Sequence, residues 1–192
     1  PSTQTAQVRI YSRLLYSVAK IKSKELQDPW YTLMNFFGSL RELATTITLI
    51  QVDIPDRLRL LQKRYFDDNK NIRKIKEILE LTSRLENDQI PVAIDQLEVP
   101  TTLTDTKKRP IDMCLTSNII EVGIDIDRLS LITILGQPKT TSSYIQVSGR
   151  IGRKWEERPG LVVSMYGSKR PRVKSHFEKF DFLYQIFQNL PN

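Results

Sequence analysis

The apolar positions at the start of the chain follow a helical period and then change to a continuous run. Residues 6–26 carry apolar side chains three and four positions apart, which predicts an amphipathic helix. The positions that define its face are Ile10, Leu14, Val18 and Ile21. The aromatic run 30–37 follows a proline and predicts a buried strand. Two further helices are predicted, one from Gly38 to about Ile50 and one with Pro55 in its first turn.

The rest of the chain alternates between apolar runs and polar stretches. A short strand is predicted near 80–82, followed by a helix with Pro91 in its first turn. Clearer apolar runs predict strands at 111–117, 129–135 and 160–166, and helices at 140–149 and 173–188. Apolar strands separated by helices and short loops predict an α/β fold with a mainly parallel sheet.

Length and composition suit one domain, with or without an appendage. The chain has 192 residues, of which 40% are hydrophobic, so it can build a substantial core. We interpret residues 1–28 as an N-terminal helical segment and residues 29–192 as the main domain. The charged stretch near 66–80 is a candidate helical insertion.

Several function classes are excluded by composition. The longest apolar runs are only a few residues, which excludes a membrane span, and the N-terminus has no signal-peptide pattern. A single cysteine, Cys114, excludes internal disulfides and cysteine-cluster metal sites. A single histidine, His176, excludes multi-histidine sites. A cytoplasmic setting fits these features, and the absence of an initiator Met leads us to expect a chain cut from a longer protein.

The charge balance points to a polyanionic partner. The formal net charge is +7 and the isoelectric point is near 9.5, a balance that favours partners such as nucleic acid. The excess is uneven, because residues 139–179 hold ten Lys or Arg against three Glu.

The stretch TSNIIEVGIDI, residues 116–126, follows a predicted strand. Thr116 and Ser117 offer hydroxyls and N–H groups suited to phosphates, Gly123 permits close approach, and Asp125 could accept from a ribose hydroxyl. A capped turn with an ordinary loop aspartate is the alternative, and taken alone this stretch favours it.

Two more stretches carry candidate chemistry. LGQPKTT, residues 135–141, places Gln137 and Lys139 where a nucleic-acid backbone contact is plausible, although a simple strand-to-helix turn fits equally well. QVSGRIGR, residues 146–153, places two arginines one turn apart after a helix that should end near Gly149. Guanidinium groups match phosphate oxygens, whereas surface salt bridges are the alternative. We expect all three stretches at the carboxyl ends of the strands, where ligands of parallel sheets collect.

The order and spacing of these stretches resemble the second RecA-like motor domain of superfamily 2 helicases. TSNIIEVGIDI resembles motif V, and QVSGRIGR matches motif VI, Q-x-x-G-R-x-G-R, at every fixed position. The resemblance covers residues 110–168 and, more loosely, the motif IV region at 30–44. The sequences of residues 28–43 and 136–153 are also similar to those of large bacterial helicases of the DISARM antiphage type. The implied fold is a RecA-like three-layer domain with an extra N-terminal helix.

The resemblance implies roles for the nucleotide-facing residues. Arg150 and Arg153 would reach the ATP γ-phosphate as arginine fingers, and Gln146 would help to sense the nucleotide. Gly123 and Asp125 would contact the nucleotide, Asp125 through the ribose.

The resemblance also implies a grip on the nucleic-acid backbone. Thr116 and Ser117 would hold the backbone, and Gly38 and Ser39, at the end of the motif IV strand, would add a contact. Lys139 is a further candidate for this role.

The sequence supplies only half of such a motor. It contains no G-x-x-x-x-G-K-[ST] loop and no D-E-x-H segment, so the phosphate-binding Lys and the main Mg²⁺ ligand must come from a first motor domain. The implied cofactor is therefore ATP with Mg²⁺ held mainly by that domain, and the chain alone is expected to be inactive.

Expected partners are nucleic acid, with DNA favoured over RNA, and the first domain. No membrane partner is expected, and self-association of the chain is an option. The alternatives are a basic nucleic-acid-binding module without motor activity and, less favoured, a stand-alone nucleotide-binding protein.

Overall fold

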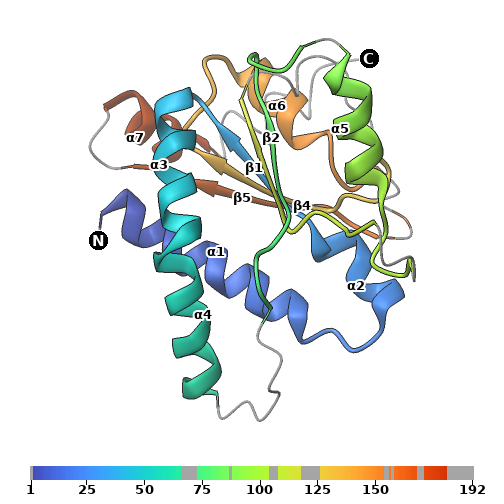
Figure 1. Ribbon diagram of the computed structural model, residues 1–192. Coiled ribbons are helices and arrows are strands. Elements are labelled where there is room, and N and C mark those ends of the chain that lie inside the picture. Colours follow the sequence, from blue (N-terminus) through green and yellow to red (C-terminus); the bar gives the residue numbers. More distant parts are fainter. Residues whose placement is uncertain are drawn as a thin grey trace.

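The computed structural model of the chain describes residues 2–65, 73–86, 88–103, 108–117, 126–153, 156, 158–167 and 171–180. Within these ranges twelve elements are formed (Figure 1). In chain order they are α1 (Thr3–Ala19), α2 (Lys24–Tyr31), β1 (Leu33–Phe37), α3 (Leu40–Gln51), α4 (Asp53–Arg64), β2 (Ile78–Leu81), α5 (Gln89–Glu98), β3 (Met113–Thr116), β4 (Leu131–Leu135), α6 (Thr141–Ser148), β5 (Leu161–Met165) and α7 (Pro171–Glu178).

The five strands form one sheet in which every neighbouring pair is parallel. Their order is β2-β3-β1-β4-β5, so β1 lies in the centre. All residues of β1, β3 and β4 are buried, as expected for strands that are covered on both faces. The predicted α/β fold with a mainly parallel sheet is confirmed.

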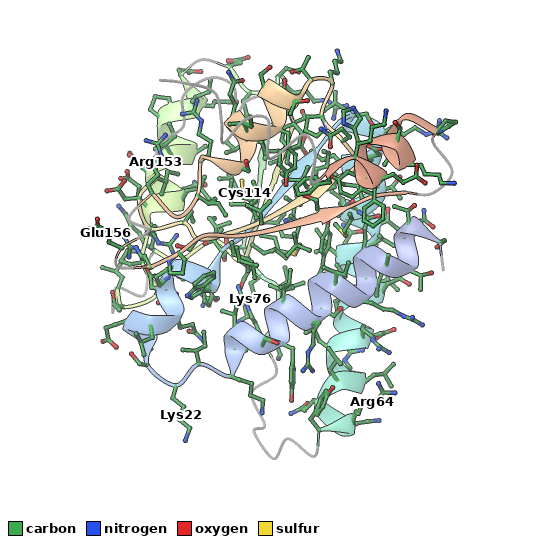
Figure 2. The ribbon with its side chains drawn as sticks, turned by 180° about the vertical axis from the view of Figure 1, so that it is seen from behind. Lys22, Arg64, Lys76, Cys114, Arg153 and Glu156 are labelled. Carbon is green, nitrogen blue, oxygen red and sulfur yellow. The ribbon has the colours of Figure 1, made fainter. Side chains whose placement is uncertain are left out.

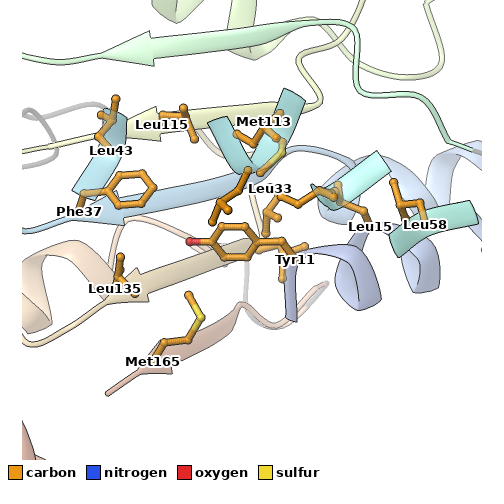
Figure 3. Packing of buried hydrophobic residues seen from close by; sticks show 14 of the residues in the cluster. Tyr11, Leu15, Leu33, Phe37, Leu43, Leu58, Met113, Leu115, Leu135 and Met165 are labelled. Atoms are coloured by element: carbon orange, nitrogen blue, oxygen red, sulfur yellow. The ribbon is translucent and has the colours of Figure 1, made fainter. Parts of the chain in front are cut away.

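Side chains alternate between the two faces of the sheet and build two separate cores. On one face, Leu33 and Phe37 of β1 pack with α1, α3 and α4. Figure 3 shows Tyr11 of α1 among side chains from β1, β3, β4 and β5 on this face. On the other face, Met34 and Phe36 pack with α5 and α6. The helices therefore cover the sheet in two layers.

The N-terminal helix contributes to the main core. Tyr11 and Leu15 of α1 are completely buried, whereas Ile10 and Leu14 are only partly buried. The predicted helix is confirmed, but its buried face is turned by one position from the predicted one. Burial raises the pKa of the Tyr11 hydroxyl, so this group stays protonated at neutral pH.

Two predicted boundaries are wrong. The first helix ends at Ala19, because Ser23 starts α2 by accepting a hydrogen bond from the Leu26 N–H (3.3 Å). The strand predicted from Trp30 begins only at Leu33, because α2 continues to Tyr31. The predicted helices at Gly38–Ile50 and after Pro55, and the helix with Pro91 in its first turn, are confirmed as α3, α4 and α5.

The candidate insertion near 66–80 falls partly on described residues. Residues 66–72 lie outside them, residues 73–77 form no regular element, and Ile78–Leu81 is strand β2. The carboxylate of Asp112 holds this segment by accepting from the N–H groups of Lys76 (2.9 Å) and Glu77 (3.1 Å) and from Arg73. The end of the stretch therefore belongs to the sheet.

A buried ion pair closes the amino edge of the sheet. The guanidinium of Arg128 lies 3.1 Å from the Asp28 carboxylate, and it also donates to Thr32 (3.3 Å) and to the Leu97 carbonyl (2.7 Å). Burial alone would raise the pKa of Asp28, but hydrogen bonds from Arg128 and from the Thr101 N–H outweigh it and lower the pKa. The pair thus favours the folded state wherever Asp28 is ionised.

Asp28→Asn is expected to lower the free energy of unfolding at pH 7 by about 3 kcal/mol, because it leaves the Arg128 charge buried without its partner. A lowered folded-state pKa stabilises the fold above the unfolded pKa of about 4 and loses this contribution as the pH falls through the folded-state value. The difference between wild type and variant should therefore shrink below about pH 4. Urea unfolding at several pH values measures it. Asp56→Asn, which breaks an exposed pair with Arg59, should cost less than about 1 kcal/mol, and equal losses in both variants would contradict the assignment.

Candidate nucleotide and nucleic-acid site

Helix α6 carries the glutamine and leads into the two arginines of the QVSGRIGR stretch. Its N-cap is Thr140, whose hydroxyl accepts from the Ser143 N–H (3.0 Å). The helix ends at Ser148, and the Gly149 N–H donates back to the Ile145 carbonyl (2.8 Å). The predicted end of this helix is confirmed.

The second glycine of the stretch is required by a contact inside the chain. Gly152 has a φ of +63°, a backbone conformation that favours glycine. A Cβ at this position would lie 2.3 Å from the Gly160 nitrogen. The Gly152 N–H also donates to the Leu129 carbonyl (2.9 Å). The glycine therefore fixes the arginine-bearing turn, residues 149–153, against the rest of the domain.

These anchors place the arginine-bearing turn at the amino edge of the sheet. Leu129 and Gly160 lie just before the starts of β4 and β5. The expectation that this stretch lies at the carboxyl ends of the strands is therefore wrong. The physical reason is topological, because α6 follows β4 and must return the chain to the amino edge before β5 can pair in parallel.

The polar side chains of QVSGRIGR that the resemblance singles out differ in their exposure. Arg153 and Gln146 are exposed and Arg150 is half-buried, and Figure 2 shows Arg153 near the margin of the molecule. The predicted spacing of one helical turn between the two arginines is not kept, because Gly152 between them has a positive φ, which interrupts a regular helical turn.

The residues predicted to contact the nucleic-acid backbone gather at the opposite, carboxyl edge. Ser39 follows β1 and caps α3 by accepting from the Glu42 N–H (3.3 Å), and Gly38 beside it is exposed. Lys139 follows β4 and is exposed. The structure thus brings Gly38, Ser39, Thr116, Ser117 and Lys139 to one edge and separates them from the arginines.

Thr116 and Ser117 are less accessible than the motif suggests. Thr116 is completely buried and Ser117 is 5% exposed. The Ser117 N–H donates to the Leu81 carbonyl (3.2 Å), so it is already used within the sheet. Gly123 and Asp125 lie outside the described residues.

A cavity of about 410 Å³ lies beside Ser39 at the carboxyl edge. Its walls come from the first turns of α1 and α3, from Gly136 after β4 and from Gly167 after β5. Gln7 stiffens this wall, since its amide donates to Thr46 (3.0 Å) inside the core. The exposed side chain of Arg41 lines the cavity and is a candidate phosphate contact. Sequence reasoning missed this residue, and the only signal for it is that Arg41 closely follows the cap of a predicted helix.

The remaining features considered in the sequence are the single cysteine, metal sites and membrane-spanning helices. Cys114 is a free, fully buried thiol, and burial raises its pKa well above the ordinary value. In the described part of the chain, no three His, Cys, Asp or Glu side chains gather as metal ligands would. No helix among the described residues has the length and apolar character needed to span a membrane.

The close approach at Gly152 is testable with a matched pair of variants. Gly152→Ala should destabilise the chain by at least about 2 kcal/mol, because strain at positive φ adds to overpacking against Gly160. Gly136 has a φ of +76°, but a Cβ added there would meet nothing within 4 Å, so Gly136→Ala should cost only about 1 kcal/mol. Thermal and urea unfolding measure both, and equal losses would mean that the contact with Gly160 is not a constraint.

Comparisons with known proteins agree with this architecture. The family described as helicase conserved C-terminal domain matches residues 48–154. The DISARM protein DrmA of Bacillus paralicheniformis is 40% identical over 188 residues, which cover 96% of this chain and 16% of that protein. The ATP-dependent helicase Lhr-Core of Methanocaldococcus jannaschii is 36% identical over 58 residues, 30% of this chain and 7% of that protein.

Among solved structures, S. cerevisiae Dbp5 bound to Gle1 and IP6 matches with a TM-score of 0.57 and 16% identity, over 99% of this chain and 38% of that one. This likeness concerns the fold alone. The chain spans about a sixth of the length of its DrmA relative. Because the family match covers more than half of its residues, the chain belongs to the helicase conserved C-terminal domain family, as the second RecA-like domain of a superfamily 2 helicase.

Proposed function

We propose that this domain completes the ATP site of a nucleic-acid motor by presenting Arg150 and Arg153 to nucleotide bound on another motor domain. The observation that carries the proposal is the arginine-bearing turn, which glycine packing holds at the amino edge while Arg153 stays exposed. A guanidinium fixed in this way could stabilise the charge that develops on a transferring phosphoryl group.

ATP would supply the phosphoryl group, and its Mg²⁺ would be held mainly by the other domain. The sequence supports this division, because it contains neither the phosphate-cradling lysine loop nor a D-E-x-H segment. Gln146, exposed on the last turn of α6, would contact the nucleotide and so couple its state to the position of α6. Gly123 and Asp125 remain candidates for further contacts with the nucleotide.

The carboxyl edge would hold the nucleic-acid backbone. Gly38, Ser39 and Lys139 are exposed there and offer N–H, hydroxyl and ammonium donors, which suit phosphate oxygens without reading sequence. Thr116 and Ser117 would act by shaping this edge, since both are buried. The nucleotide and the nucleic acid would then contact opposite edges of one rigid sheet. Closure of the two motor domains on ATP would therefore move the residues that hold the nucleic-acid backbone.

We propose DNA rather than RNA as the strand. The 40% identity to the DISARM protein DrmA supports a place for the domain within a large bacterial protein of that kind. A basic binding module without motor activity is the competing function, supported by the net charge of +7.

The arginine assignment is tested in the full-length protein by ATP hydrolysis with and without single-stranded DNA. Arg153→Ala should lose DNA-stimulated turnover by about 10³-fold, because an arginine finger contributes at least that much in related phosphoryl transfer. Arg153→Lys, which keeps the charge but not the planar fork, should lose most of the turnover as well. Both variants should still bind DNA in fluorescence anisotropy.

Arg59→Ala removes one positive charge from an exposed site on α4 and serves as the control, with turnover near wild type. If Arg153→Ala hydrolyses ATP as fast as wild type, the motif does not act as a finger and the binding module becomes the better description. The 192-residue chain alone should show no Mg²⁺-dependent hydrolysis above background.

A further inference from the structure

A second concentration of positive charge lies between α1 and α4, on the face of the sheet opposite α5 and α6. The two helices pack against each other and leave a groove of about 410 Å³. It is lined by Arg9 and Arg13 of α1, by Arg57, Leu61 and Arg64 of α4, and by Tyr65. We call this cavity the α1–α4 groove.

Among the described residues, no carboxylate lines the groove. No Asp or Glu occurs before Glu25, and the acidic residues of α4 lie only in its first turn. Asp56 is paired with Arg59, which does not line the groove. The next acidic residues in the chain, Asp67 and Asp68, lie outside the described residues.

The arginines of the groove lack the carboxylate partners that the two buried arginines of this domain have. Within the described ranges, the side chains of Arg9, Arg57 and Arg64 make no hydrogen bond or ion pair, and the Nε of the half-buried Arg57 is buried without a partner. By contrast, the buried guanidiniums of Arg73 and Arg128 each meet an aspartate. A buried donor without an acceptor is costly, so the groove has the charge and the open donors of an anion site.

Aromatic rings interleave with these charges. The rings of Tyr16 and Tyr65 stack with their centres 5.8 Å apart, and the Arg13 guanidinium lies 4.8 Å from the centre of the Tyr65 ring. Tyr65 is 51% exposed, which leaves ring surface for a further stacking partner. Cationic grooves with exposed aromatic faces are typical of single-stranded nucleic-acid sites.

The positive side chains on the α1 side of the groove are arranged in a line, which favours a linear ligand. Arg9, Arg13, Tyr16 and Lys20 follow one another at helical spacing along a single stripe of α1. At 1.5 Å per residue the stripe extends for about 16 Å, a length over which a stacked strand presents about five phosphates. A compact anion would not need such a stripe.

We propose that the α1–α4 groove binds the phosphate backbone of single-stranded nucleic acid as a contact separate from the motor cleft. Figure 2 shows Arg64 and Arg153 at opposite ends of the molecule, so the groove and the arginine-bearing turn are different surfaces. The proposal does not rest on the arginine fingers, because it is tested by binding without ATP. It adds a place where the strand is held between α1, which precedes the motifs of the family, and α4, which lies between motifs IV and V.

The test measures binding of a labelled oligothymidylate of about 20 nucleotides to the 192-residue chain by fluorescence anisotropy over a series of salt concentrations. Arg57→Gln with Arg64→Gln should weaken binding about tenfold at low salt and make the slope of log K against log salt less steep by about 1.4, the value for two lost phosphate contacts. The matched control is Arg59→Gln with Lys63→Gln, which removes the same charge from α4 outside the groove. The control should keep the wild-type slope, and both variants should unfold at similar temperatures.

Several outcomes would overturn the proposal. Wild-type affinity and slope in the groove variant would mean that the strand binds elsewhere. An equal loss of affinity in both double variants would show that the effect comes from net charge alone and not from the groove. Displacement of the oligonucleotide by poly-glutamate as effectively as by unlabelled oligothymidylate would assign the groove to an acidic protein segment instead. Loss of ATP turnover in Arg153→Ala with intact groove binding would leave this proposal standing, so the two failures are distinguishable.

Discussion

The position of the candidate nucleotide site depends on the buried guanidinium of Arg128. It joins Asp28 in α2 to the Leu97 carbonyl near the end of α5. Taking this charge out of water is tolerable only when all its partners are present. The segment that leads into β4 is therefore fixed, and the very next carbonyl, that of Leu129, receives the Gly152 N–H. One buried charge thus positions the arginine-bearing turn.

This arrangement separates the two halves of the proposed activity along the sheet. The turn with Arg150 and Arg153 lies at the amino edge, whereas Ser39 and Lys139 lie at the carboxyl edge. The strands between them are buried on both faces, and close-packed interiors transmit displacement with little compression. A movement imposed at one edge would consequently be passed to the other by the whole body of the domain rather than by a flexible loop.

The sequence was informative where local chemistry decides the structure. The hydroxyl-bearing residues at the starts of α3 and α6 could be recognised as the beginnings of helices, and the apolar runs of β3 and β4 as buried parallel strands, because each signal lies within a few residues. The start of β1 could not be found in this way. Trp30 has the aromatic character of a strand residue, but α2 is extended by the contact of Asp28 with Arg128, which lies 100 residues away in sequence.

The candidate site was predictable in its composition and less so in its location. The motif drew attention to the arginines and glycines of the turn, but nothing in the motif indicates that Gly152 packs against Gly160. The return of α6 to the amino edge follows from parallel pairing and could have been deduced once the strands were assigned. The accessibility of Thr116 could not, because its burial depends on packing across the sheet.

The N-terminal helix shows why a segment outside the recognised motifs matters for the function. Tyr11 and Leu15 are completely buried against the sheet, so α1 is part of the rigid body that carries the arginine-bearing turn. Its opposite side carries arginines without any acidic neighbour on the helix. A strand held on that side would be connected to the sheet through the core and not through a tether. Any rotation of the domain during nucleotide turnover would then move this contact by the same angle as the proposed backbone contacts at the carboxyl edge of the sheet. Both contacts would act on the nucleic acid together.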